Sequence, residues 1–220
     1  MILTIGNKKP KGICGSGLIN IVAVLFETGV IDNKGKFDRD LNTPRVRERD
    51  GVFEYVLSWE DETALDRDIV ISEIDIENLI RAKGAIFSGC RTLLDEVGLD
   101  ISNIERILLA GGFGSYVDLE KAIVIGLLPE LNPDKINYIG NGSLLGARMS
   151  SLSNHIRKNV TEVMKKMTNF ELSETRSFMD HFVAALFLPH TDLSLFPKLK
   201  ERLEHRRSER FTNISKSAGQ

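Results

Sequence analysis

Apolar residues dominate residues 18–29, LINIVAVLFETG, with hardly a polar face along the stretch. A helix that is apolar nearly all round is typical of the interior of a domain. We therefore predict a buried helix that begins near Ser16. Gly29 marks its end, since glycine commonly follows the last turn of a helix.

A second helical pattern follows Ser72, which forms a capping box with Asp75. The serine oxygen accepts a bond from the backbone three residues on, and the carboxylate reaches back. Apolar residues then recur mostly at three- and four-residue steps, and Gly98 ends the helix. These positions are Ile76, Leu79, Ile80, Phe87, Cys90, Leu94 and Val97.

Two glycines, Gly84 and Gly89, interrupt this long helix. Each costs about 1 kcal/mol relative to alanine. The cost suggests that another backbone or a ligand approaches there, and a harmless surface glycine is the alternative. Arg81 and Lys83 lie beside Gly84, so either cation could reach a nucleotide, although a solvated helix face is the favoured interpretation.

Residues 31–50 are polar and contain glycine and proline, which predicts a surface loop. Residues 52–59, VFEYVLSW, are rich in aromatic and β-branched side chains, and residues 69–71 are short and β-branched. Such segments are typical of paired strands. We expect residues 31–71 to form a small inserted subdomain or hairpin excursion.

A strand followed by glycines and a helix occurs twice further along the chain. Residues 104–110 lead into GGFGS at 111–115, and residues 136–140 lead into NGS at 141–143. This alternation predicts an α/β fold, a mixed sheet flanked by helices. Ligands of open α/β sheets bind at the carboxyl ends of strands, where these glycines fall.

Gly111 and Gly112 are the strongest candidates for a binding site. Without Cβ atoms, the chain can turn sharply and a flat or charged ligand can lie against bare peptide groups. The motif is not the Rossmann fingerprint, because Val117 stands where the third glycine belongs, and it has no P-loop lysine. A structural tight turn fits the two glycines as well as a nucleotide contact does.

Residues 12–17, GICGSG, are a second candidate. The N-terminus of a helix with small residues offers free N–H groups and a partial positive charge to an anion. A nucleophilic Cys14 would need a base, and the four histidines are distant in sequence. A small residue packed at a helix start is the favoured interpretation.

Composition narrows the classes of function. The 220 residues include 29 Lys and Arg against 31 Asp and Glu, a net charge of −2, which argues against nucleic acid or an anionic membrane as the partner. Two cysteines are too few for a disulfide scaffold or an iron–sulfur cluster. No apolar run approaches the roughly 20 residues that span a bilayer. The first residues, MILTIGNKKPKG, lack the apolar core of a signal peptide. We expect a soluble, reduced, cytoplasmic protein.

Several motifs occur in a characteristic order: GICGSGL, AKGAIFSG, ILLAGGFGSYVD, GLLPE, IGNGSLLGA and FMDHFVAALFLP. In this order they resemble the C-terminal end of the reductive activators of corrinoid proteins. These are ATP-dependent members of the actin-like ATPase superfamily, which also contains sugar kinases, acetate kinase, actin and heat-shock chaperone ATPases. The resemblance implies a ribonuclease-H-like second lobe made of residues 1–30 and 72–190, with 31–71 inserted and 191–220 as a charged, partly disordered tail.

The resemblance also implies where ATP would lie. Gly111 and Gly112 match the adenosine motif of the superfamily, and Phe113 would contact the adenosine with them. Lys83 and Gly15 would be second contributors. No residue of this chain is expected to act as a general base or nucleophile.

Full-length relatives carry an N-terminal 2Fe–2S domain, a linker and a two-lobed ATPase core. The resemblance implies that they use ATP and Mg²⁺ to drive an electron from the cluster to cobalt(II) of a corrinoid protein, restoring cobalt(I). The expected partner is the corrinoid protein, with a homodimer as a further option, and neither nucleic acid nor a membrane.

This chain opens on residues that look like the end of a strand and has neither phosphate loop of the family nor the cluster cysteines. We therefore expect a fragment that binds ATP weakly and hydrolyses none by itself. The alternatives are a piece of a small-molecule kinase, or a non-catalytic module in which residues 178–189 and the charged tail dock a partner.

Overall fold

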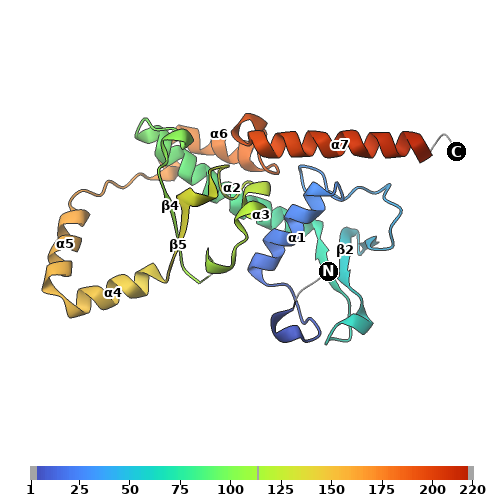
Figure 1. Ribbon diagram of the computed structural model, residues 1–220, viewed down its shortest axis with the longest axis horizontal. Helices are drawn as coiled ribbons and strands as arrows, with labels where there is room; N and C mark the ends of the chain where they lie inside the picture. The colour runs from blue at the N-terminus through green and yellow to red at the C-terminus, as the bar shows by residue number, and fades with distance from the viewer. Residues whose placement is uncertain (1–3, 113, 218–220) are drawn as a thin grey trace.

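The computed structural model describes residues 4–112 and 114–217 (Figure 1). Its helices are α1 (Gly15–Glu27), α2 (Glu73–Glu96), α3 (Leu119–Val124), α4 (Gly142–Leu152), α5 (Asn154–Met164), α6 (Arg176–Ala185) and α7 (Pro197–Ser217). Its strands are β1 (Val46–Arg49), β2 (Val52–Ser58), β3 (Ile69–Ser72), β4 (Ile107–Ala110) and β5 (Ile136–Gly140). Within the described residues, no helix is both long and apolar enough to cross a bilayer.

Helix α1 lies in the core, as its apolar sequence predicts. Ile19, Val22 and Ala23 are all nearly inaccessible to solvent, and α1 packs against α3. Cys14 caps the helix, and Gly29 follows its end at a φ of +73°, which favours glycine.

Helix α2 confirms the predicted capping box: Ser72 Oγ accepts from the Asp75 N–H, and the Asp75 carboxylate accepts from the Ser72 N–H. Its two interior glycines are buried. A Cβ at Gly84 would lie 3.3 Å from the carbonyl oxygen of Ala185, so close packing of α6 accounts for that glycine. Cys90 and Val97, which the pattern placed on the apolar face, are exposed.

Strands β1, β2 and β3 form an antiparallel sheet in that order, so the hairpin predicted from residues 52–59 and 69–71 is confirmed. The segment before it is only partly a surface loop. Ile31 and Phe37 pair across an isolated bridge, and both side chains are buried in the core cluster. The sheet packs on α2. That residues 31–71 form a separate subdomain stays a prediction.

Strands β4 and β5 form a parallel pair with register Ile107↔Ile136 and Leu108↔Asn137. The α/β class is therefore confirmed, with one antiparallel and one parallel sheet flanked by helices. Parallel strands are normally covered on both faces. Here Leu108 is 54 % exposed, and Tyr138 and Ile139 are also exposed.

The C-terminal segment packs into the body. The chain after α6 enters the core, where Leu188 is 1 % exposed, and Phe196 and Leu199 are buried beyond it. Residues 197–217 form α7, a long helix within the segment for which we expected a partly disordered tail (Figure 1). The motif at residues 178–189 therefore has an internal packing role.

Helices α4 and α5 form an arm that projects from the rest of the molecule (Figure 1). We refer to residues 142–167 as the α4–α5 arm. Neither helix has a buried residue, and the two helices pack mainly on each other. Ser153 separates them and caps α5 through its hydroxyl oxygen.

Candidate functional site

The two parallel strands end side by side in glycine. β4 runs into Gly111, whose N–H donates to the carbonyl oxygen of Gly140 at 2.7 Å. Both glycines have positive φ, +94° at Gly111 and +65° at Gly140. Residues with a side chain rarely adopt such angles, so glycine is needed at both strand ends.

The space beside these glycines is open. A Cβ placed on Gly111, Gly112 or Gly140 would meet no atom of the described residues within 4 Å. The absence of side chains is therefore not explained by a neighbouring helix, in contrast to Gly84. Bare peptide groups at the carboxyl ends of parallel strands form the kind of surface against which ligands of α/β sheets bind.

Helix α4 begins at the same place. Asn141 caps it, with Oδ1 accepting from the Leu144 N–H at 3.0 Å. A Cβ at Gly142 would lie 3.7 Å from the Cβ of Ala110, so the first turn of α4 is close to the end of β4. The partial positive charge of a helix N-terminus therefore lies beside the two strand ends.

The chain after the glycines is held against β5. Tyr138 donates its hydroxyl hydrogen to the carbonyl oxygen of Val117 at 2.6 Å, and Val117 is buried. Partial loss of solvent around the hydroxyl, with a smaller contribution from the charge of Asp118, raises the pKa of Tyr138 above its ordinary value. The phenol is therefore neutral at pH 7 and remains a donor.

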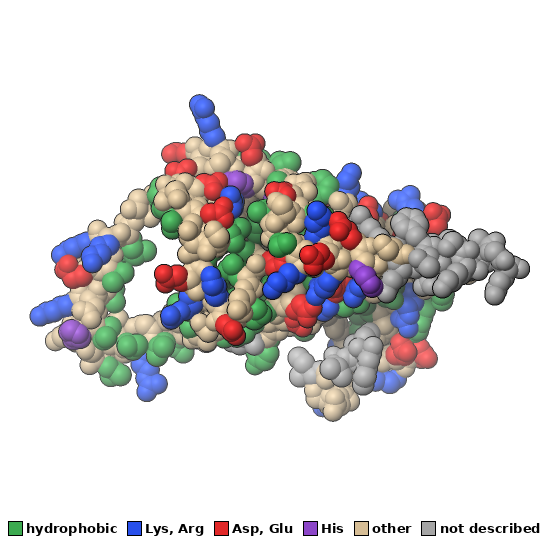
Figure 2. Space-filling view, turned by 45° about the horizontal axis from the view of Figure 1, so that its top comes forward, with side chains coloured by type: hydrophobic (Ala, Val, Ile, Leu, Met, Phe, Trp, Pro, Cys, Tyr) green, Lys and Arg blue, Asp and Glu red, His purple; other side chains and the backbone are tan. Residues whose placement is uncertain are grey.

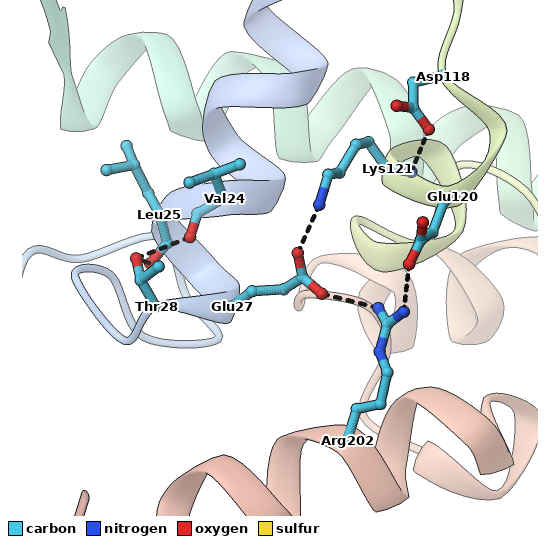
Figure 3. Close-up of polar contacts among 8 residues, drawn as sticks. All are labelled: Val24, Leu25, Glu27, Thr28, Asp118, Glu120, Lys121 and Arg202. Atoms are coloured by element: carbon cyan, nitrogen blue, oxygen red, sulfur yellow. Dashed lines mark hydrogen bonds and ion pairs between the residues drawn. The ribbon is translucent and has the colours of Figure 1, made fainter. Parts of the chain in front are cut away.

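Helix α3, which follows, is anchored by a network of ion pairs (Figure 3). The buried carboxylate of Glu27 accepts from Lys121 Nζ at 2.8 Å and from Arg202 at 2.7 Å, and Arg202 also pairs with Glu120. Asp118 caps α3 by accepting from the Lys121 N–H. These contacts join α1, α3 and α7 and fix the far end of the segment that carries the glycines.

The sequence-predicted site residues occupy three different places. Gly111 and Gly112 lie together at the end of β4, next to Gly140. Phe113 lies outside the described residues. Gly15 is exposed in the first turn of α1, and Lys83 lies on α2.

Lys83 is in the interior and not on a solvated helix face. It is 1 % exposed, and its Nζ donates to the carbonyl oxygens of Phe187 and Pro189 at 2.6 and 2.7 Å. Burial lowers the pKa of Lys83 to about 7. Both partners belong to the segment after α6, so the ammonium group ties α2 to that segment. This placement does not support a contact between Lys83 and a ligand.

At the start of α1, the polar groups bond locally. Cys14 Sγ accepts from the Gly17 N–H at 3.3 Å and lies 3.5 Å from Ser16 Oγ. These bonds, the one to Ser16 first, hold the pKa of the Cys14 thiol below its ordinary value. The thiol acts as the helix cap, but Cys14 is exposed and not packed as the favoured interpretation expected.

Gly140 also belongs to the site, although it was not among the residues expected there. The sequence did contain a pattern that indicates it, because IGNG repeats the strand-then-glycine arrangement of LLAGG. Sequence alone could not show that the two strands pair in parallel and so bring both ends together.

Metal-binding groups do not gather in the described part of the chain. No cluster of three or more His, Cys, Asp or Glu side chains there could hold a metal ion. The sequence has only two cysteines: Cys14, which is the N-cap residue of α1, and Cys90, which lies within α2. They do not provide the ligand set of a 2Fe–2S cluster.

Comparison with known proteins decides the family. The model of the family described as "C-terminal domain of RACo the ASKHA domain" matches residues 1–200. This chain belongs to that family. It is thus an ASKHA domain, of the actin-like class that the ordered motifs from GICGSGL to FMDHFVAALFLP indicate.

Three relatives of this ASKHA domain are informative. The "Corrinoid activation enzyme RamQ" of Eubacterium limosum is 32 % identical over 186 residues, covering 81 % of this chain and 31 % of that protein. The "[Co(II) methylated amine-specific corrinoid protein] reductase" of Methanosarcina barkeri is 28 % identical over 207 residues, covering 88 % and 34 %. A solved structure, "Reductive activator for corrinoid,iron-sulfur protein", matches with a TM-score of 0.82 and 51 % identity, covering 89 % of this chain and 31 % of that one. The chain therefore spans about a third of the length of these relatives.

Proposed function

We propose that this ASKHA domain supplies the adenosine side of an ATP site in a protein that reductively activates a corrinoid protein. The observation that carries the proposal is the pair of strand ends at Gly111 and Gly140, which leave open space beside bare backbone. A flat purine nucleoside fits against peptide groups without side chains, and Gly112 extends that surface.

The proposed activity follows the names of the relatives. Two are described as a corrinoid activation enzyme and a Co(II) corrinoid protein reductase, and the solved structure as a reductive activator. In the proposed reaction one electron passes from a reduced 2Fe–2S cluster, outside this chain, to cobalt(II); the cluster is oxidised and cobalt(I) is formed. ATP binding would favour one conformation of the complex over another, which is how nucleotide can alter an equilibrium elsewhere in a protein.

We assign part of the cofactor binding to this domain and part to the rest of the protein. The open glycine surface fits an adenosine group. The two cysteines do not fit a 2Fe–2S cluster, and the described residues contain no group of three or more His, Cys, Asp or Glu side chains that could hold a metal ion. We therefore assign the cluster, Mg²⁺ and the phosphate-binding groups to sequence outside this chain, and we expect the chain alone to bind ATP weakly and to hydrolyse none. The kinase alternative has no support in the relatives, and the proposed lobe remains residues 1–30 and 72–190.

The test is a substitution that fills the proposed nucleoside space in the intact protein. Gly112→Leu places its side chain where a Cβ meets no atom of the described residues within 4 Å, so the fold should persist. We expect ATP affinity to fall by about tenfold or more, as each 1.4 kcal/mol of lost contact is tenfold, with Gly112→Ala intermediate. Calorimetric titration with ATP measures the affinity, and the absorbance change from cobalt(II) to cobalt(I) measures the ATP-dependent reaction.

Gly12→Leu is the matched control, because a Cβ at Gly12 also meets nothing within 4 Å and Gly12 lies by the other candidate site. We expect it to bind ATP as the unaltered protein does. Unchanged ATP affinity in Gly112→Leu would contradict the proposal. Loss of ATP binding in Gly12→Leu alone would place the nucleotide at the start of α1.

A further inference from the structure

The turn that follows Gly112 folds back onto the two parallel strands. A Cβ at Gly114 would lie 3.5 Å from the Cβ of Leu109, so the chain returns along the strand that it has just left. The short helical turn Gly114–Tyr116 contacts both β4 and β5. The turn is therefore laid over the strand pair.

Two hydrogen bonds fix this turn at its ends. At the start, the Gly111 N–H donates to the carbonyl oxygen of Gly140 at 2.7 Å. At the end, the Tyr138 hydroxyl donates to the carbonyl oxygen of Val117 at 2.6 Å. Tyr138 belongs to β5, so the second bond ties the turn to the strand beside the one that carries the glycines. Gly112 lies between the two fixed points.

The α4–α5 arm gives this turn little support. Figure 2 shows an opening between the arm and the body, and Figure 1 places β4 and β5 on the body side of that opening. Within the turn, Tyr116 is 79 % exposed, and its hydroxyl bonds no described residue. Of the side chains that the structure describes, Tyr138 is the one that bonds the turn between Gly112 and Val117.

We propose that Tyr138 is a positioning residue for nucleotide binding, whose hydroxyl holds the turn so that the peptide groups at Gly111 and Gly112 are already arranged for adenosine. This inference rests on the proposed function and adds a residue that acts on the site through the turn. A segment held at one end only would lose backbone freedom when the ligand binds, and that loss opposes binding. A segment held at both ends has lost this freedom beforehand, so more of the contact energy appears as affinity.

The position and the chemistry of Tyr138 suit this role. It lies in register with Leu109 of β4, directly beside the strand on which the turn folds back. Its pKa is above the ordinary value, so the phenol is protonated at pH 7 and the donor is present. Phenylalanine at this position would keep the ring and remove only the hydroxyl. A single atom can therefore be deleted to release the end of the turn.

The first test deletes this hydroxyl in the intact protein. Tyr138→Phe should weaken ATP binding by about three- to tenfold, the size that the loss of one hydrogen bond corresponds to. Calorimetric titration with ATP and Mg²⁺ measures the affinity, and the thermal unfolding midpoint is recorded on the same samples. Tyr116→Phe is the matched control, because it deletes the same atom from an exposed ring in the same turn. We expect it to bind ATP as the unaltered protein does.

A second measurement separates positioning from a general loss of stability. In Tyr138→Phe, the ATP concentration that gives half the maximal rate of cobalt(I) formation should rise by about three- to tenfold. The rate at saturating ATP should not change, since bound ATP orders the turn in every molecule. A less stable fold would instead reduce the fraction of active protein, which lowers the maximal rate and leaves the ATP requirement as it was.

A double substitution tests whether Tyr138 acts through the glycines. Alanine restricts the backbone more than glycine does, so in a Gly112→Ala protein less freedom remains for the tyrosine bond to remove. Adding Tyr138→Phe there should lower ATP affinity by a smaller factor than it does in the unaltered protein. Equal factors in the two backgrounds would show that Tyr138 acts independently of Gly112 and would contradict the inference.

The outcomes distinguish the positioning role from the proposed function. Weaker ATP binding in Tyr138→Phe, with the maximal rate and Tyr116→Phe unchanged, supports the positioning role. If Gly112→Leu loses ATP affinity and Tyr138→Phe keeps it, the positioning role is overturned and the proposed function stands. Equal losses in Tyr138→Phe and Tyr116→Phe, or a fall in the maximal rate alone, also overturn it. If Gly112→Leu binds ATP as the unaltered protein does, the proposed function fails and the positioning role with it.

Discussion

The helical body and the α4–α5 arm bury their side chains very differently. In the body, formed by α1, α2, α3, α6 and α7, apolar side chains from distant parts of the chain share one core. Even ionisable side chains are enclosed there: Lys83 donates to two carbonyl oxygens, and Glu27 forms ion pairs. In the arm, no residue of α4 or α5 is buried. The arm helices therefore gain little from packing on this chain.

This difference shows how to distinguish residues that the packing of the fold requires from residues that could contact a ligand. A glycine that faces a neighbouring backbone, like Gly126, is needed for packing. A glycine with open space beside it, like Gly112, has no such explanation. The same contrast separates the enclosed carboxylate of Glu27 from the solvated Glu162.

The largest expected effect comes from Gly126→Ala. A Cβ there would lie 2.1 Å from the carbonyl oxygen of Pro189, and Gly126 has a φ of +75°. We expect the free energy of unfolding to fall by about 4 kcal/mol from the clash and the backbone strain together. Urea denaturation measures it. Gly140→Ala, at a φ of +65° with no atom within 4 Å, should lose only about 1 kcal/mol from strain. Equal losses would contradict the contrast.

The next effect is expected from Glu27→Ala. The substitution removes a carboxylate that is 6 % exposed and leaves Lys121 and Arg202 without it. Breaking such an enclosed pair should lower the free energy of unfolding by about 3 kcal/mol. Glu162→Ala, in a pair whose side chains are about two-thirds exposed, should change it by less than about 0.5 kcal/mol. A loss below 1 kcal/mol in Glu27→Ala would show that the network adds little.

A smaller effect, with a pH signature, is expected from Lys83→Met. The variant leaves the carbonyls of Phe187 and Pro189 without their donor, which should lower the free energy of unfolding by about 2 kcal/mol at pH 7. Burial lowers the pKa of Lys83 to about 7 in the folded state, so between about pH 7 and 10 the unfolded chain binds more protons.

The free energy of unfolding of the unaltered protein should therefore rise through that pH window, by at most about 1.4 kcal/mol per pH unit. Well below pH 7 the lysine is protonated in both states, so it should add nothing to the pH dependence there. Lys83→Met should lack the rise, so the gap between the two proteins widens from pH 7 to 9. Urea unfolding at four pH values measures it, with the exposed Lys166→Met as control. Parallel curves for Lys83→Met and the unaltered protein would contradict a buried titrating lysine.

Local patterns predicted the elements of the body well. The capping box at Ser72, the stop at Gly29 and the hairpin of β2 with β3 each depend on neighbours in sequence. The close approach at Gly84 was also predictable, because an interior glycine carries a cost that something must offset. The partner itself, Ala185, could not be predicted, since it lies a hundred residues away.

The candidate site was predictable only in part. The paired glycines after β4 were found from their pattern, whereas Gly140 depends on strand pairing. Lys83 was misplaced because a lysine beside Arg81 on a helix reads as polar surface, and only the carbonyls after α6 make its burial tolerable. The exposure of the α4–α5 arm could not be foreseen, as its apolar periodicity is typical of a helix packed on a core.

The bond between Glu27 and Arg202 joins residues 175 positions apart. On the ribosome, α1 is synthesised near the start of this segment, α3 follows only near its middle, and Arg202 on α7 only near its end. Until then its apolar surface has no cover, and contacts between such distant residues form slowly. Nascent chains halted before Arg202 should thus be the species on which molecular chaperones act.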